Sequence, residues 1–286
     1  MRDRVCIITG ATAGIGLAVA RELANRGAIL VLIAHNGHEV SKCVDALRSE
    51  TGNEAIDGVA ADLSLISDVR RAARDFERRY SSLHVLVNNA GALFPQRTVT
   101  LEGLECNLAL NHLAYFALTN TLLDVLKASA PSRIINVSSI VHRFGRLDFA
   151  DLQSTYGYDR WRAYAQAKLA NVLFTYELAR RLEGTGVTAN TLHPGFVATE
   201  FAANSTQLLD RFLRWIMPVA AVHASRAAET IIHLATSPDL QHTSGKYFVG
   251  TRASRSSRLS YDARLAAELW SESDALCQEY ILQNKQ

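Results

Sequence analysis

Two side chains with complementary acid–base properties stand one helical turn apart in the stretch Tyr164-Ala165-Gln166-Ala167-Lys168. Positions four apart share one face of a helix, so the lysine ammonium is expected beside the tyrosine phenol. A free phenol has a pKa of about 10 and is a poor acid or base at neutral pH. A neighbouring positive charge lowers that pKa, which predicts general acid–base chemistry at Tyr164 with Lys168 as its partner.

A glycine-rich turn near the start of the chain reads Thr9-Gly10-Ala11-Thr12-Ala13-Gly14-Ile15-Gly16 and joins an apolar run to a stretch with helical periodicity. Glycines let backbone N–H groups approach a pyrophosphate at the positive end of the helix that follows. Such turns also occur for steric reasons alone. Taken by itself, the turn leaves both a dinucleotide site and a purely structural turn open.

Further motifs follow in order: Asn88-Asn89-Ala90-Gly91, Leu110-Asn111-His112, Asn136-Val137-Ser138-Ser139, and His193-Pro194-Gly195 with Thr199 a turn later. Together with the TGxxxGxG turn and the YxxxK pair, they resemble the short-chain dehydrogenase/reductase family over nearly the whole chain. The resemblance implies a single-domain Rossmann fold and hydride transfer between a nicotinamide dinucleotide and a carbonyl or alcohol.

The resemblance also implies roles for four side chains. Tyr164 exchanges a proton with the substrate oxygen, Ser139 hydrogen-bonds the same oxygen, and Lys168 holds the nicotinamide ribose. Asn111 holds a water that connects Lys168 to solvent. Ser138 is the alternative to Ser139; the family usually uses the second serine, and strand alternation turns the two side chains to opposite faces, so we assign the role to Ser139.

The family's cofactor contacts fall on the glycine turn, the strand ends and the catalytic pair. The implied cofactor-binding residues are Gly10, Thr12, Ala13, Gly14, Ile15, Gly16, His35, Asn36, Asp62, Leu63, Asn89, Ala90, Gly91, Tyr164, Lys168, Pro194, Gly195, Val197 and Thr199. The family distinguishes NAD from NADP at the end of the second strand, here Ala34-His35-Asn36. No acidic residue stands there to repel the extra phosphate of NADP, and His35 replaces the arginine that is usual in the branch. Because histidine can donate a hydrogen bond to a phosphate, NADP(H) is favoured over NAD(H). Asp62 is expected to contact the adenine, with a helix-capping aspartate as the alternative.

Ser139 and Tyr164 are 25 residues apart, a longer spacing than most family members have, and the added stretch carries His142, Phe144, Phe149 and Trp161. This spacing and the neighbouring sequence are similar to the retinol dehydrogenase and WW-domain oxidoreductase branch.

Residues 196–224 are expected to form a substrate lid, in which Leu209, Phe212, Leu213 and Ile216 recur at helical spacing. An apolar lid favours a hydrophobic ketone, aldehyde or primary or secondary alcohol. The same pattern fits packing on the core, an oligomer interface or a shallow membrane contact. Branch members that act on retinoids often carry an N-terminal membrane anchor, which is not expected here, so retinoid activity is not inferred.

Short apolar runs alternate with segments of helical length, which predicts a doubly wound parallel sheet of about seven strands with helices on both faces. The predicted strands are 4–9, 29–34, 54–61, 83–88, 133–138, 187–193 and 246–250; the predicted helices are 14–26, 38–50, 66–80, 101–129, 156–183, 224–236 and 261–283. We expect one domain over 1–286, with a dinucleotide-binding and catalytic core (1–195), the lid (196–224) and a C-terminal cover (225–286). The arginine- and serine-rich stretch 251–260 is interpreted as an exposed connection. By resemblance, a homodimer or homotetramer would form through the helices near 101–129 and 156–183.

Composition excludes several other classes of protein. Thirty basic and 28 acidic side chains leave a net charge of +2, which favours no nucleic-acid partner. No apolar run approaches the roughly 20 residues of a membrane span. Cys6, Cys43, Cys106 and Cys277 form no CxxC pair, and His112, His142 and His193 show no ligand spacing, so we expect no metal and a cytoplasmic location. Two alternatives stay open: a non-catalytic dinucleotide sensor or scaffold, and a pathway-specific reductase of a polycyclic natural product.

Overall fold

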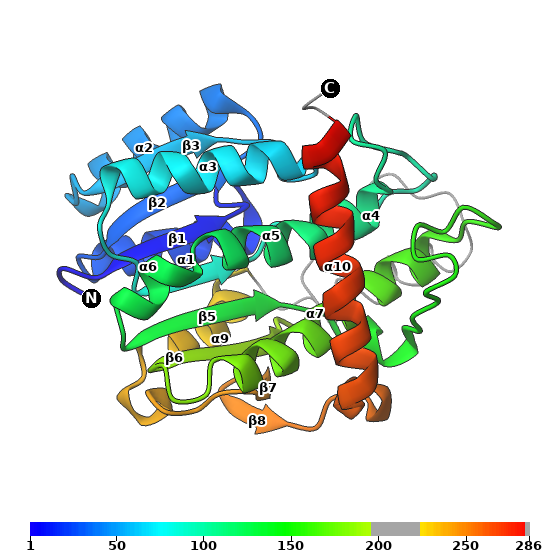
Figure 1. The fold of residues 1–286 in the computed structure, drawn as a ribbon. Helices are drawn as coiled ribbons and strands as arrows, with labels where there is room; N and C mark the ends of the chain where they lie inside the picture. The colour runs from blue at the N-terminus through cyan, green and yellow to red at the C-terminus, as the bar shows by residue number, and fades with distance from the viewer. Residues whose placement is uncertain (196–223, 284–286) are drawn as a thin grey trace, which may run out of the picture.

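The computed structural model describes residues 1–195 and 224–283. Its eight strands form one sheet in the order β3-β2-β1-β4-β5-β6-β7-β8, in which every neighbouring pair is parallel except β7 and β8 (Figure 1). The strands are β1 (Val5–Thr9), β2 (Ile29–Ala34), β3 (Ile56–Ala60), β4 (Val85–Asn88), β5 (Ser132–Val137), β6 (Val187–His193), β7 (Tyr247–Val249) and β8 (Arg252–Ser254). The strand order reverses between β1 and β4, where doubly wound sheets bind their ligands.

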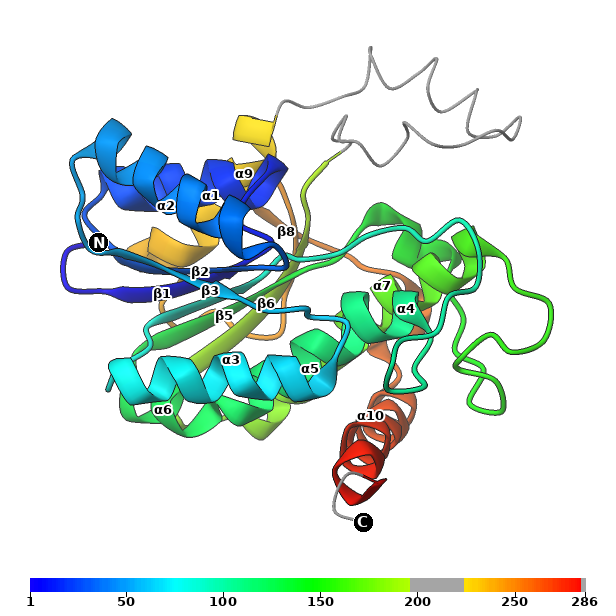
Figure 2. The same cartoon turned by 90° about the horizontal axis from the view of Figure 1, so that it is seen from above.

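Helices cover both faces of the sheet, as Figure 2 shows from above. One layer contains α1 (Gly14–Asn25), α2 (Gly37–Thr51) and α9 (Ala224–Thr236); the other contains α3 (Ile66–Arg79), α5 (Ala114–Thr121), α6 (Leu123–Ala128) and α7 (Arg160–Arg181). Successive side chains of a strand point to opposite faces of the sheet, so Ile7 packs into one apolar core and Ile8 into the other. Ile7 lies between Val31 of β2 and Leu86 of β4 in the register of the sheet. Burial on both faces explains why these strands are almost wholly apolar.

All seven predicted strands are present, but the sheet contains an eighth strand that was not predicted. The eighth strand, β8, lies in the stretch 251–260 and pairs antiparallel with β7 across a turn at Gly250, where φ is +59°. All three residues of β8 are exposed, so no apolar signal marks it. The expected exposure of this stretch is confirmed for most of its residues, but it forms a strand and a short helix and is more than a connection. The short helix η5 (Arg258–Tyr261) follows, and within it Ser260 is buried.

The predicted helix 101–129 is divided into four segments. They are α4 (Cys106–Leu108), the π-helical turn η1 (Ala109–Leu113), α5 and α6. The Glu105 carboxylate accepts hydrogen bonds from the backbone of Asn107 and Leu108 and so sets the start. The predicted helix 156–183 likewise begins later, at α7, because the Asp159 carboxylate caps its first turn.

The C-terminal helix α10 (Ala263–Gln283) packs across α7 and α5 (Figure 1). The Trp270 ring lies 5.0 Å from the Phe116 ring and 5.7 Å from the Phe174 ring, and the Arg181 guanidinium lies 4.1 Å above it. These contacts cover surfaces of α5 and α7, the two helices through which the family resemblance led us to expect a subunit interface. The predicted lid, residues 196–224, lies outside the described residues apart from Ala224. None of the helices in the described ranges has the length and hydrophobicity needed to cross a membrane.

Candidate active site

The glycine turn leaves β1 in a conformation that only glycine adopts without strain. Gly10 and Gly14 have φ values of +65° and +55°. A Cβ atom added to Gly16 would lie 2.2 Å from the Gly10 carbonyl oxygen, so the start of α1 can approach β1 only without a side chain. The spacing of the glycines therefore follows from the geometry of this turn.

The amino end of α1 has no side-chain cap, so its first backbone N–H groups can bind an anion. Its N-cap residue is Ala13, which supplies no side-chain acceptor, and its first turn carries no acidic residue. Ala13 and Gly14 are exposed, Thr12 is half-buried, and Ile15 packs on the core. The first N–H groups and the positive end of the helix dipole are thus turned toward a ligand, which suits a pyrophosphate.

The loop after β4 is tied to the glycine turn. The Thr9 hydroxyl accepts hydrogen bonds from the backbone of Asn89 (2.8 Å) and Ala90 (3.0 Å), and Asn89 Nδ2 donates to the Thr9 carbonyl (2.9 Å). A Cβ atom on Gly91 would lie 2.6 Å from Asn111 Oδ1 and 3.2 Å from Lys168 Nζ. Gly91 therefore lets the loop pack directly against Asn111 and Lys168. We call the backbone of this loop and of the glycine turn the glycine-lined cradle.

Asn111 lies in the π-helical turn η1, a distortion that is frequent at functional sites. Its side chain holds the loop after β4, because Nδ2 donates to the Ala92 carbonyl (2.8 Å) and Oδ1 accepts from the Ala92 N–H (3.2 Å). Its carbonyl accepts a hydrogen bond from Asn171 Nδ2 (2.7 Å). The sequence analysis missed Asn171, although it lies three positions after Lys168 and so on the same face of α7.

Tyr164 and Lys168 meet as their spacing predicts. Lys168 Nζ lies 5.4 Å from the centre of the Tyr164 ring and 5.6 Å from that of Tyr115, and it donates a hydrogen bond to the Val137 carbonyl (3.3 Å). Tyr115 Oη in turn donates to the Ala90 carbonyl. The pair is therefore enclosed between the ends of β4 and β5.

The electrostatics of the pair differ from the sequence-based expectation. Burial raises the pKa of Tyr164 above its ordinary value, and burial lowers the pKa of Lys168 from 10.5 to about 7. Both side chains are almost fully removed from water, with 9% and 3% of their surface exposed, so desolvation disfavours the phenolate and the ammonium alike. The protein alone thus keeps the phenol protonated, and the expected lowering of its pKa by Lys168 is not found.

The two serines after β5 have different partners. Ser138 donates its hydroxyl hydrogen to the Lys168 carbonyl (2.7 Å) and is therefore engaged with α7. Ser139 is the N-cap of the short helix η2 (Ile140–Phe144), and its Oγ accepts from the Val141 N–H at 3.4 Å. Ser139 is half-buried, whereas Ser138 is buried, so Ser139 is the more accessible of the two serines.

The residues assigned to the adenosine half lie at the ends of β2 and β3. The His35 side chain is 77% exposed, and its Nδ1 lies 3.7 Å from Asp62 Oδ2. The Asn36 carboxamide oxygen caps α2, and the Leu63 side chain is buried in the core. Asp62 Oδ1 accepts from the backbone and hydroxyl of Ser64.

Asp62 is not a helix cap, so that alternative is wrong. The first N–H groups of α3, at Ile66 and Ser67, donate to the Glu102 carboxylate at 2.5 Å and 2.9 Å. Of the remaining cofactor positions, Pro194 and Gly195 follow β6, and both are half-buried. Val197 and Thr199 lie outside the described residues.

The long stretch between Ser139 and Tyr164 packs against the loop after β4. Gln153 Oε1 accepts from the Glu105 N–H (3.0 Å), and Tyr158 Oη donates to the Phe94 carbonyl (2.6 Å). Of its aromatic residues, Phe149 packs on the core, Phe144 is 80% exposed, and Trp161 has a buried Nε1 with no hydrogen-bond partner among the described residues. Trp161 is three positions from Tyr164 on α7.

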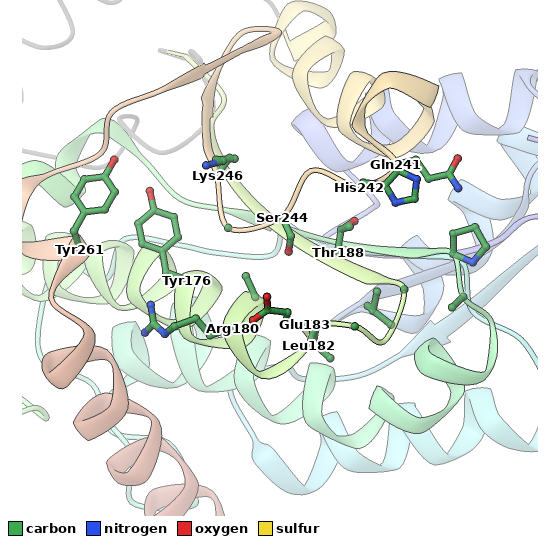
Figure 3. Close-up of a pocket in the computed structure, with 17 residues that line it drawn as sticks. Tyr176, Arg180, Leu182, Glu183, Thr188, Gln241, His242, Ser244, Lys246 and Tyr261 are labelled. Atoms are coloured by element: carbon green, nitrogen blue, oxygen red, sulfur yellow. The ribbon is translucent and has the colours of Figure 1, made fainter.

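A pocket of about 900 Å³ lies away from these residues, at the amino ends of β5 and β6. Figure 3 shows Tyr176 and Arg180 of α7 on one side of it and Lys246 on another. None of the predicted site residues lines it. In the described part of the chain, no group of histidine, cysteine and acidic side chains is arranged to hold a metal ion.

Comparisons with known proteins identify the family of this chain. The family model of the short chain dehydrogenases matches residues 4–209. This chain belongs to the short-chain dehydrogenase family. It is 40% identical over 271 residues to human retinol dehydrogenase 12, covering 94% of this chain and 85% of that protein, which supports the retinol dehydrogenase branch.

Two solved structures show the same fold. An uncharacterized protein of Mycobacterium paratuberculosis matches with a TM-score of 0.78 and 31% identity, over 97% of this chain and 94% of its own. The active-site complex of Pseudomonas aeruginosa RhlG with NADP matches with a TM-score of 0.70 and 26% identity, over 87% and 94%. Family membership supports oxidoreductase activity with a nicotinamide dinucleotide.

Proposed function

We propose that this short-chain dehydrogenase transfers hydride between a nicotinamide dinucleotide and a hydrophobic ketone, aldehyde or alcohol, with Tyr164 as the general acid–base residue. The observation that carries the proposal is the packing of Lys168 against Tyr164 beneath Gly91, where only a residue without a Cβ fits. The same end of the sheet carries Ser139 and Asn111. A purely structural role would not require a buried lysine at the mouth of a glycine-lined cradle.

The residues fit a dinucleotide. Gly10, Gly14 and Gly16 leave the amino end of α1 without side chains that would block a pyrophosphate, and Gly91 brings the loop after β4 close to Lys168, the residue proposed to hold the nicotinamide ribose. When bound, the dinucleotide supplies or accepts the hydride. The chain's own residues orient the substrate and move the proton.

In the reduction direction, Tyr164 holds a proton at Oη and gives it to the carbonyl oxygen as the carbon receives hydride. Burial keeps the phenol protonated for this step. Ser139 donates its hydroxyl hydrogen to the same oxygen, which stabilises the negative charge that develops there. Lys168 binds the ribose hydroxyls, and Asn111 shapes the route by which water reaches the lysine. In the oxidation direction the same groups act in reverse.

For the cofactor, we propose NADP(H) over NAD(H). His35 is exposed at the end of β2, where it can donate to a phosphate. Its Nδ1 lies 3.7 Å from Asp62 Oδ2. The RhlG structure, with its NADP, is an example of the same fold with this cofactor.

For the substrate, the similarity to retinol dehydrogenase 12 supports a long apolar alcohol or aldehyde. The four cysteines are buried and free, which supports a reducing compartment such as the cytoplasm. The direct experiment measures dinucleotide-linked turnover on a panel of aldehydes and ketones of increasing apolar size, with NADPH and with NADH. The proposal predicts kcat/KM that rises with apolar size. Binding of dinucleotide without turnover on any member of the panel would refute the enzymatic proposal and favour a sensor.

A further inference from the structure

One peptide group, between Ser139 and Ile140, is held at both ends by buried histidines from different elements. Its carbonyl oxygen accepts a hydrogen bond from His142 Nδ1 at 2.7 Å. Its N–H donates to His193 Nδ1 at 3.2 Å. His142 lies in η2, and His193 is the last residue of β6. The peptide that follows Ser139 is therefore fixed by two side chains that the reaction described above does not use.

The partners determine where the protons of both rings lie. His142 Nε2 accepts from the Ser257 N–H at 3.0 Å, and a backbone N–H can only donate. The proton of neutral His142 must then be on Nδ1, which faces the Ser139 carbonyl. His193 receives the Ile140 N–H on Nδ1, so its proton is on Nε2. The two rings are held in opposite tautomers.

The surroundings of His142 and His193 favour the neutral form of both imidazole rings. Burial lowers the pKa of His142, and the Arg143 guanidinium acts in the same direction. Burial, assisted by His142, lowers the pKa of His193 to about 4. Protonation of His142 on Nε2 or of His193 on Nδ1 would place a second hydrogen against a backbone N–H, so both bonds require the neutral rings.

We propose that His142 and His193 are positioning residues for Ser139, which fix the peptide after it and thereby the direction of its hydroxyl. This inference rests on the proposed function, in which Ser139 contacts the substrate oxygen. With the 139–140 peptide held at both ends, ψ of Ser139 cannot change without breaking a bond to a histidine. The extended backbone at Ser139 (φ −152°, ψ 160°) then fixes its Cα–Cβ bond, and the Val141 N–H, which Oγ accepts at 3.4 Å, favours one rotamer of the hydroxyl.

The arrangement also links the C-terminal segment to the site. Ser257 bonds to His142, the neighbouring Ser256 hydroxyl bonds to Tyr176 Oη of α7 (2.8 Å), and the His142 ring packs 4.9 Å from the Tyr247 ring. The serine-rich stretch after β8 therefore helps to hold the His142 ring in place.

The tautomers can be tested without any assay of activity. In ¹⁵N-histidine NMR spectra of the whole protein, we expect His142 as the Nδ1–H tautomer and His193 as the Nε2–H tautomer, unchanged between about pH 5.5 and pH 8. Exchange between tautomers, or protonation of either ring near pH 6, would overturn the proposed arrangement. This result is independent of whether the substrate class is correct.

The effect on catalysis is tested by a double-mutant cycle. His142→Phe keeps an aromatic ring beside Tyr247 but removes both hydrogen bonds, and we expect kcat to fall about tenfold or more at unchanged dinucleotide affinity. In the Ser139→Ala background the same substitution should change kcat by less than about twofold, because the residue that it positions is gone. Equal losses in both backgrounds, or full kcat in folded His142→Phe, would contradict the proposal.

The matched control is His84→Phe. His84 Nδ1 also accepts a backbone N–H, that of Val5 at 3.0 Å, but at the opposite end of the strands. It should leave kcat unchanged. The cycle is repeated with His193→Phe, so that the proposal can still be tested if one of the two histidine variants does not fold. His193→Asn should restore most of kcat, because the asparagine Oδ1 can accept the Ile140 N–H. If Ser139→Ala keeps wild-type kcat, the proposed role of the serine fails, while the NMR result still decides the tautomers.

Discussion

Replacement of Lys168 by methionine should stabilise the fold while it abolishes activity. The pKa of Lys168 falls from 10.5 to about 7 on burial, and at about 1.4 kcal/mol per unit this corresponds to about 4 to 5 kcal/mol of free energy that opposes folding at neutral pH. Lys168→Met removes that cost but also the bond to the Val137 carbonyl and the contact with the aromatic rings, worth about 1 to 2 kcal/mol together. The net gain in the free energy of unfolding is about 2 to 4 kcal/mol at pH 7.

The sign of the pH dependence follows from proton binding. Between pH 7 and 10.5 the unfolded chain carries a proton on Lys168 that the folded protein lacks, so wild-type stability rises with pH across this window. The advantage of Lys168→Met is therefore largest at and below pH 7 and shrinks as pH approaches 10.5. Urea unfolding at about pH 7 and about pH 9.5 measures both values. Lys127→Met, at an exposed position of α6, is the control and should show no such trend. A variant that is less stable than wild type at pH 7, or a difference that does not change with pH, would refute this reasoning.

Three further outcomes follow from single contacts. Gly16→Ala places a Cβ 2.2 Å from a backbone carbonyl, so dinucleotide affinity measured by fluorescence titration should fall at least about tenfold, whereas Gly37→Ala, whose Cβ meets only Ala60 at 3.4 Å, should retain it. His35→Arg should raise the ratio of kcat/KM for NADPH over NADH by about tenfold, equivalent to one added charged hydrogen bond; an unchanged ratio would exclude this position from cofactor selection. A dimer or tetramer built on α5 and α7 requires α10 to move away, so Trp270→Ala should increase self-association in native mass spectra; an unaltered distribution would show that these helices do not form the interface.

The sheet was predictable because its signals are local. Runs such as Val5–Thr9 are wholly buried and, apart from Thr9, apolar, and the spacing of the glycines reflects a steric requirement that acts within seven residues. β8 gave no signal because its residues are exposed and its pairing depends on β7 alone. The π-helical turn at Asn111 was also not predictable, since its sequence is ordinary for a helix and it packs against α7, a helix from a distant part of the chain.

The identity of the site residues was likewise easier to predict than their energetics. The spacing of Tyr164 and Lys168 placed them on one face, but the direction of their pKa shifts depends on how completely the surrounding elements exclude water. Long-range partners were beyond reach as well. Glu102 caps α3 from 36 residues away, and Ser257 bonds to a histidine 115 residues earlier in the chain.

The central claim is that Tyr164 transfers the proton. Tyr164→Phe removes one oxygen atom and leaves the ring beside Lys168, so the fold and the glycine-lined cradle should be retained. The decisive measurement compares kcat of this variant with wild type on the best substrate of the panel, alongside dinucleotide affinity. We predict a fall in kcat of about 10² to 10⁴ with affinity unchanged. Wild-type kcat in a variant that binds dinucleotide normally would contradict the assignment.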